Sequence, residues 1–274
     1  MPRTVGGSVK EASELEVATV LQSLRGAGGA LVAMSGGVDS AVVAALLSRA
    51  VGSDAFAVTL AGPAVSEAEV DRAVRVARHI GIRHELVEID PLRSPEYRAN
   101  PSNRCYFCRQ IETSALRAWG ASRGVERFYD GIHRDDLAEE RPGIRAMEEA
   151  GFLHPLARAG WGKAEVRRYA RSIGLPNADQ PSDACLASRV RHGQAISAEL
   201  LRRVAEAESG LYRRGFVRVR VRVEGTGARV EVDPFETDRL LGEPTATAVR
   251  AELARLGFDP VALDPAGYRR AGSA

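Results

Sequence analysis

Short apolar runs alternate with longer amphipathic stretches along the first two thirds of the chain. Residues 30–34 form a continuous apolar run, Ala-Leu-Val-Ala-Met, which is typical of a strand buried on both faces of a parallel sheet. A glycine-containing turn follows, and residues 41–50 are rich in good helix formers. The alternation predicts a doubly wound parallel-sheet α/β domain, whose ligand lies at the carboxyl ends of the strands. The predicted strands are residues 30–34, 54–60, 84–89 and 127–130, and the predicted helices are residues 11–25, 41–50, 66–80, 108–122 and 163–173.

The pattern changes near residues 188–196. Beyond this point a helix (197–213) precedes two strands with alternating polar and apolar positions, and a further helix (245–256) follows them. The two strands cover residues 217–223 and 229–232. We therefore predict a large α/β domain over residues 1–190 and a smaller α+β domain over residues 191–274.

Composition narrows the classes of partner. The 274 residues include 38 Lys and Arg against 36 Asp and Glu, so the formal net charge of +2 does not indicate a nucleic-acid partner. No run of about 18 apolar residues occurs, and no apolar segment with a cleavage site follows the start, so we expect no membrane partner and a cytoplasmic location. Only Lys10 and Lys163 are lysines, so almost all of the basic side chains are arginines.

The turn after the first predicted strand carries the strongest local signal. Residues 35–40 are Ser-Gly-Gly-Val-Asp-Ser, in which two glycines allow close approach of an anion and the next helix presents its N-terminal amides. Ser35 and Ser40 add hydroxyl donors, and Asp39 is a candidate ligand for Mg²⁺. The segment lacks the Gly-Lys-Ser/Thr of a Walker loop, so it does not predict a γ-phosphate hydrolase. A phosphate-binding loop is the interpretation that we favour over an ordinary strand-to-helix turn.

The three cysteines form the second signal. Cys105 and Cys108 make a Cys-x-x-Cys pair and Cys185 stands alone, an arrangement that suits metal ligands or reactive thiols better than a disulfide framework. Three thiolates suit three irons of a cubane cluster and leave the fourth iron open for hydrosulfide. A redox pair and three buried structural cysteines remain alternatives. A zinc site is another alternative, in which the fourth ligand would come from His133, His154 or His192.

The hexapeptide resembles the pyrophosphate-binding loop of the PP-loop ATP pyrophosphatases. Members of that superfamily split ATP between its α- and β-phosphates and activate a carboxylate or carbonyl oxygen as its adenylate. The resemblance implies that the loop residues bind ATP and hold the departing pyrophosphate. These residues are Ser35, Gly36, Gly37, Asp39 and Ser40.

A wider set of motifs covers residues 100–108, 130–136, 141–143, 181–189 and 220–222. Together these motifs resemble the LarE family, and the similarity runs from about residue 14 to residue 260. Those enzymes are ATP-dependent sulfur transferases that make the nickel-pincer nucleotide cofactor. The resemblance implies adenylation of a carboxylate of pyridinium-3,5-biscarboxylic acid mononucleotide and replacement of its oxygen by sulfur. It also implies a homo-oligomer, a hexamer or a trimer, and a role for Gly131 in binding ATP.

The resemblance also ranks the interpretations of the cysteines. In one branch of the family a single cysteine, at the position of Cys185, donates its own sulfur and is left as dehydroalanine. In another branch three cysteines hold a [4Fe-4S] cluster, and Cys105, Cys108 and Cys185 match that set. We therefore expect the cluster, with sulfide from an external source, and keep sacrificial transfer from Cys185 as the alternative.

Arginines complete the predicted site. Arg218, Arg220 and Arg222 share one face of the alternating strand, where guanidiniums suit a phosphate or carboxylate. The family pattern implies that Arg220 and Arg222 bind the substrate mononucleotide, with Glu231 on the next strand. Beside the cysteines, Arg104 and Arg189 are candidate ligands of substrate or sulfide.

Two positions depart from the family pattern. The chain has His133 where the family often has asparagine, and Glu224 where histidine commonly follows the arginine strand.

Two other classes of function remain open. A tRNA thiolase is one rival, because some PP-loop tRNA-modifying enzymes also use three cysteines. An amidating synthetase or a nucleotide-binding regulator with zinc-bound cysteines is the other. Salt-sensitive RNA binding would favour the first rival, and zinc without iron would favour the second.

Overall fold

The computed structural model describes residues 14–26, 28–138, 141–181 and 183–269. The chain folds into two compact units. The second unit begins at Ala184 and also takes two segments of the preceding chain, Pro63–Ser66 and Asp90–Arg104; the rest forms the first unit. The functional division between residues 1–190 and 191–274 stays a prediction, because compactness alone does not test it.

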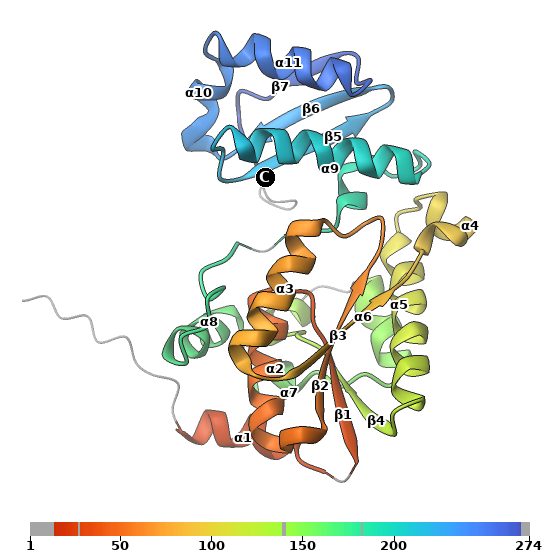
Figure 1. Cartoon of the computed structure of the whole chain (residues 1–274), viewed down its shortest axis with the longest axis vertical. Helices are drawn as coiled ribbons and strands as arrows, with labels where there is room; N and C mark the ends of the chain where they lie inside the picture. The colour runs from red at the N-terminus through yellow and green to blue at the C-terminus, as the bar shows by residue number, and fades with distance from the viewer. Residues whose placement is uncertain (1–13, 27, 139–140, 182, 270–274) are drawn as a thin grey trace, which may run out of the picture. The chain divides into compact units, whose positions relative to one another are not determined.

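The first unit is built on a parallel sheet of four strands in the order β3-β2-β1-β4 (Figure 1). In the centre, Val32 lies opposite Ala57 on one side and Tyr129 on the other. The predicted α/β class is therefore confirmed. The strands are β1 (Gly29–Ala33), β2 (Ala55–Ala61), β3 (Arg83–Glu88) and β4 (Val125–Tyr129).

Helices cover both faces of this sheet. Val32 packs in an apolar cluster with residues of α2 and α8, whereas its neighbour Leu31 packs with Leu116 and Trp119 of α5. Since successive strand residues point to opposite faces, the two clusters are the two sides of a doubly wound sheet (Figure 1). The helices are α1 (Glu14–Leu24), α2 (Val38–Val51), α3 (Glu67–Ile80), α5 (Arg104–Ala121), α6 (Pro142–Glu149), α7 (Pro155–Arg158) and α8 (Lys163–Ser172).

The strand order creates a switch point beside β1. The chain runs outward from β1 to β2 and β3 and then returns to the opposite side of β1 as β4. Ligands of open α/β sheets bind where such a reversal opens a crevice at the carboxyl ends of the strands. The segments that follow β1 and β4 both begin at this edge of the sheet. The first carries residues 35–40 and the second carries residues 130–136.

Element boundaries differ from prediction where prolines and short elements are involved. The helix expected from residue 108 begins at Arg104, because a turn from Pro101 already accepts the Arg104 amide at 2.9 Å. Both Cys105 and Cys108 therefore lie near the beginning of α5. Helix α6 was not expected, although Pro142 at its first position suits a helix start. Residues 11–13 of the first predicted helix lie outside the described residues.

The second unit contains a three-stranded sheet in the order β5-β6-β7, in which β5 and β6 are antiparallel and β6 and β7 are parallel. Val219, Val221 and Val223 are fully buried on one face of β5. The arginines that alternate with them take the other face. The smaller α+β fold is confirmed. Its elements are α9 (Ala198–Arg213), β5 (Val219–Glu224), β6 (Gly227–Val232), α10 (Thr237–Leu241), α11 (Thr245–Arg255) and β7 (Val261–Leu263), together with α4 (Pro95–Arg98) from the earlier segment.

Among the described residues, no helix is both long enough and apolar enough to cross a membrane.

Candidate functional site

The loop between β1 and α2 is shaped for an anion. Gly36 has φ of 77°, and a Cβ there would lie 2.9 Å from the backbone nitrogen of Ala73, so only glycine fits. Gly37 is the N-cap of α2 and has no side chain with which to cap the first-turn amides. These amides, at the positive end of a 14-residue helix, suit a phosphate group.

Two serine hydroxyls hold the loop closed. The Ser40 hydroxyl accepts from the Ser35 amide at 3.2 Å and donates to the Gly37 carbonyl at 3.1 Å. Ser35 Oγ accepts from the Gly37 amide at 3.3 Å. Ser40 is buried, so its first contribution is to the shape of the loop.

Gly131 joins this loop from the other side of the switch point. A Cβ at Gly131 would lie 2.6 Å from the Ser40 backbone nitrogen and 2.9 Å from the Asp39 carbonyl carbon. The backbone after β4 thus packs directly on the first turn of α2. The structure brings together all six residues that were predicted to bind ATP.

Asp39 is held by a lysine that the sequence did not single out. Lys163 Nζ lies 2.8 and 2.6 Å from the two carboxylate oxygens of Asp39. His133 Nε2 is 3.9 Å from Asp39, and His133 Nδ1 is 3.2 Å from Asp136. A carboxylate with a mobile ammonium partner is suited to exchange that partner for Mg²⁺ when a nucleotide arrives.

Polar contacts support the loop from behind. The Asn177 side chain donates to the Gly36 carbonyl at 2.9 Å, and Asp130 accepts from the Ile132 amide at 3.0 Å. His154 Nδ1 lies 2.8 Å from the same Asp130 oxygen. Burial lowers the pKa of His154, but its hydrogen bond to Asp130 and the charge of Asp130 raise it, and the net pKa lies above its ordinary value. The contact with Asp130 therefore favours the charged imidazolium form of His154.

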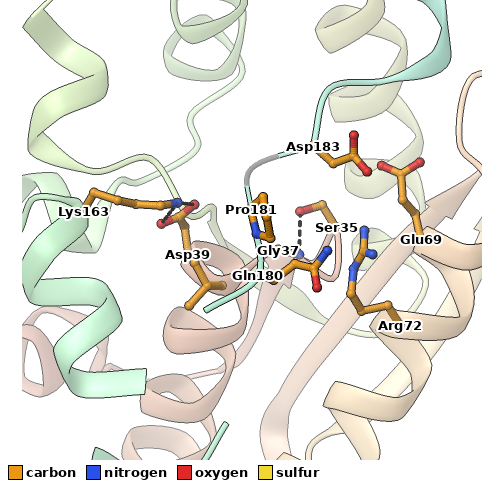
Figure 2. A pocket seen from close by; sticks show the side chains of 10 residues that line it. Ser35, Gly37, Asp39, Glu69, Arg72, Lys163, Gln180, Pro181 and Asp183 are labelled. Carbon is orange, nitrogen blue, oxygen red and sulfur yellow. Dashed lines mark hydrogen bonds and ion pairs between the residues drawn. The ribbon is translucent and has the colours of Figure 1, made fainter. Parts of the chain in front are cut away.

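A pocket of about 120 Å³ opens at the loop (Figure 2). Loop residues form one side of it, α3 contributes two charged residues, and Gln180, Pro181 and Asp183 form another side. Its lining combines two cations with three acids, which is a typical surface for a metal–phosphate ligand. The lining residues are Ser35, Gly37, Val38, Asp39, Glu69, Arg72, Lys163, Gln180, Pro181 and Asp183.

None of the cysteines is in a disulfide. Cys105 is exposed, and the half-buried Cys108 donates from Sγ to Glu112 Oε1 at 3.2 Å. Cys185 is half-buried and belongs to the second unit. No group of three His, Cys, Asp or Glu side chains forms a metal site in the part of the chain that the structure describes. Three thiols, of which Cys105 and Cys108 lie one helical turn apart on α5, are donors that fit an iron–sulfur cluster.

The arginines beside the cysteines are buried and engaged. Arg189 donates from Nε and Nη2 to Glu208 at 2.9 and 3.0 Å, and from Nη1 to the carbonyls of Ala184 and Cys185. Arg104 donates to the Ala187 carbonyl at 2.8 Å. Both side chains thus fix the segment that carries Cys185. Ligation of substrate by Arg189 stays a prediction, and these bonds favour a positioning role for it.

The charged face of the second unit is organised around Glu231. Arg222 Nε lies 2.7 Å from Glu231 Oε1, whereas the buried Glu231 Oε2 has no hydrogen-bond partner among the described residues. Arg218 and Arg220 lie over the ring of Tyr268, at 4.3 and 5.1 Å from its centroid. Three arginines and an acceptor with a vacant oxygen suit a ligand that carries both an anion and a hydroxyl.

Comparison with known proteins identifies the family of this chain. The NAD synthase family profile matches residues 11–104. The chain is 39% identical over 240 residues to an uncharacterised protein of Synechocystis, slr1717, with 88% of this chain and 90% of the relative covered. It is 29% identical over 253 residues to the pyridinium-3,5-bisthiocarboxylic acid mononucleotide synthase of Lactiplantibacillus plantarum, covering 92% and 91% of the two chains. The chain belongs to the LarE-type family of PP-loop enzymes.

This LarE-type enzyme is an ATP-dependent sulfurtransferase. A tRNA-specific 2-thiouridylase of Rhizobium leguminosarum is also similar, with 27% identity over 211 residues, but only 61% of this chain and 53% of that relative are covered. Similarity to PP-loop enzymes therefore extends beyond the LarE-type family. The match to the LarE-type synthase covers both units of this chain, whereas the match to the thiouridylase covers only part of the chain.

Proposed function

We propose that this enzyme adenylates a carboxylate of pyridinium-3,5-biscarboxylic acid mononucleotide and replaces the carboxylate oxygen by sulfur. The carboxylate oxygen attacks the α-phosphate of ATP and pyrophosphate leaves, which gives an acyl-adenylate. Hydrosulfide then attacks the acyl carbon, AMP leaves, and a thiocarboxylate remains. The observation that carries the proposal is the similarity to the named synthase over nine-tenths of both chains, including the arginine strand.

In this mechanism the first unit handles ATP. The amides of the β1–α2 loop and the hydroxyl of Ser35 bind the pyrophosphate portion, while Gly36 and Gly131 let the loop pack closely against α3 and against the segment after β4. Asp39 would hold Mg²⁺, which would neutralise phosphate charge, and the Lys163 ammonium that now contacts Asp39 would be free to donate to the phosphates. The charge that develops on the leaving group thus meets fixed donors.

We further propose that Cys105, Cys108 and Cys185 hold a [4Fe-4S] cluster. The cluster would supply an open iron to which hydrosulfide from an external source binds. Arg189 and Arg104 orient the Cys185 segment through the carbonyls that they bind. Sacrificial transfer from Cys185 is the competing route, and it would need no partner thiols.

The substrate mononucleotide is assigned to the charged face of the second unit. Arg220→Ala and Arg222→Ala are each expected to raise the substrate concentration for half-maximal rate about 10- to 100-fold, because a charge-assisted contact contributes roughly 1.5–3 kcal/mol. The ATP requirement should change far less. Steady-state kinetics with each substrate varied in turn measure the difference, with the exposed Arg202→Ala of α9 as control. Substrate affinity equal to that of the wild type in both variants would show that this face does not bind the mononucleotide.

The products of ATP test the function as a whole. With the pyridinium mononucleotide and sulfide present, the enzyme should release AMP and pyrophosphate in step with thiocarboxylate formation. ADP and inorganic phosphate as products would contradict the proposal. Stimulation of AMP release by tRNA instead of the mononucleotide would favour the thiolase, which the near-neutral charge of +2 does not suggest.

The proposal also includes the location and the assembly of the enzyme. We propose that it acts in the cytoplasm as a homo-oligomer.

A further inference from the structure

Arg72 stands out when the charges around the loop pocket are paired. The cations of the lining are Arg72 and Lys163, and Lys163 is bound to Asp39 at 2.6 Å. Arg72 forms no ion pair or hydrogen bond among the described residues, and its Nε is buried without a partner. A guanidinium nitrogen that is removed from water and left unpaired is costly unless a ligand satisfies it.

The placement of Arg72 is fixed by the same contact that requires Gly36. A Cβ at Gly36 would lie 2.9 Å from Ala73 N and 3.1 Å from the Glu69 carbonyl, so this turn of α3 is in direct contact with the loop. Figure 2 shows Arg72 extending from α3 on the side of the pocket where Ser35 lies. The helix therefore holds the Arg72 side chain in the pocket lining, on the side of Ser35.

The acids nearby do not remove the need for a ligand. Glu69, one turn earlier on α3, and Asp183 also line the pocket, and each has an interaction elsewhere. Neither forms an ion pair with Arg72 within the described ranges of the chain. Because a guanidinium presents several N–H donors in one plane, it suits a diphosphate better than a single carboxylate.

We propose that Arg72 is a ligand of the pyrophosphate leaving group. This inference rests on the proposed function, in which the loop holds the two phosphates that leave ATP. Arg72 adds a full positive charge to the partial charge of the α2 N-terminus, at the point where negative charge accumulates as the α–β bond breaks. It therefore stabilises the departing pyrophosphate more than the intact nucleotide.

Inorganic pyrophosphate with Mg²⁺ is the probe, and its binding to the full-length protein is measured by calorimetry. Arg72→Ala should weaken binding about 10- to 100-fold, and Arg72→Lys should restore part of the loss, because the charge returns without the fork. Arg75→Ala is the matched control, since Arg75 is exposed on the same helix. In turnover, Arg72→Ala should lower kcat more than it raises the KM for ATP.

The outcomes separate the two proposals. If the wild type binds pyrophosphate and Arg72→Ala binds it equally well, Arg72 is not a ligand and the loop assignment survives. If the wild type itself does not bind pyrophosphate, the proposed function of the loop fails first. A matching loss in Arg75→Ala would also overturn the inference, because the effect would then be general electrostatics.

Discussion

The Asp39→Asn enzyme is expected to release AMP at less than about 1% of the wild-type rate, while its fold is retained. The change removes the charge that holds Mg²⁺ in the proposed mechanism, and metal stabilisation of a phosphoryl transition state is worth several kcal/mol. It also leaves Lys163 without its partner at 2.6 Å. The measurement is AMP and pyrophosphate release with saturating substrate, and circular dichroism checks the fold.

Asp71→Asn is the matched control for this prediction, because Asp71 is an exposed acid of α3 outside the pocket lining. Its rate should equal that of the wild type. An Asp39→Asn enzyme that keeps most of its AMP release would mean that this carboxylate does not serve the metal. Lys163→Met would then be the informative variant, because Lys163 would be the main polar group at that side of the loop.

Replacing any one of Cys105, Cys108 and Cys185 by alanine should abolish sulfur transfer and bound iron together. A cubane held by three thiolates loses one of its three protein ligands when one cysteine is removed, which leaves two irons without a protein ligand. Anaerobic preparations should contain about four irons per chain in the wild type and little in each variant. Adenylation should persist, seen as pyrophosphate release and an acyl-adenylate that stays bound, because Cys105 and Cys108 lie outside the lining of the loop pocket.

The sacrificial route gives the opposite pattern. Cys105→Ala and Cys108→Ala would keep a single full turnover, and the spent wild-type chain would weigh less by one hydrogen sulfide, with dehydroalanine at Cys185. Repeated turnover with added sulfide and an intact Cys185 by mass spectrometry supports the cluster. One bound zinc without iron would exclude both routes for the purified protein and revive the zinc alternative.

The loop was predictable because its determinants are local. A buried strand, two glycines and a helix are adjacent in the chain, so residues 35–40 reveal their geometry without knowledge of the fold. Lys163 could not be found in this way, since it is 124 positions away from Asp39 and only the packing of α8 brings it there. Its rarity, as one of two lysines in an arginine-rich chain, was the available signal.

The roles of Arg72 and Arg189 also depend on tertiary contacts that the sequence does not reveal. On an amphipathic helix such as α3, a charged residue next to Ala73 is expected to face water, and only the contact with Gly36 places Arg72 at the pocket. Arg189 lies in a segment that carries a cysteine, so the sequence indicated a ligand. Its partner Glu208 comes from α9, and no local pattern announces that buried ion pair.

Gly131 has a consequence for how this enzyme family changes over time. The backbone after β4 and the first turn of α2 approach so closely that a methyl group between them would lie 2.6 Å from the Ser40 nitrogen. Neither segment can shift without displacing the other, although about 90 residues separate them along the chain. Substitutions that suit a new substrate near residues 132–136 must therefore be compatible with an unmoved phosphate loop. We therefore expect changes of specificity at this edge of the sheet to come from side chains, while the backbones of the two segments behave as a single piece.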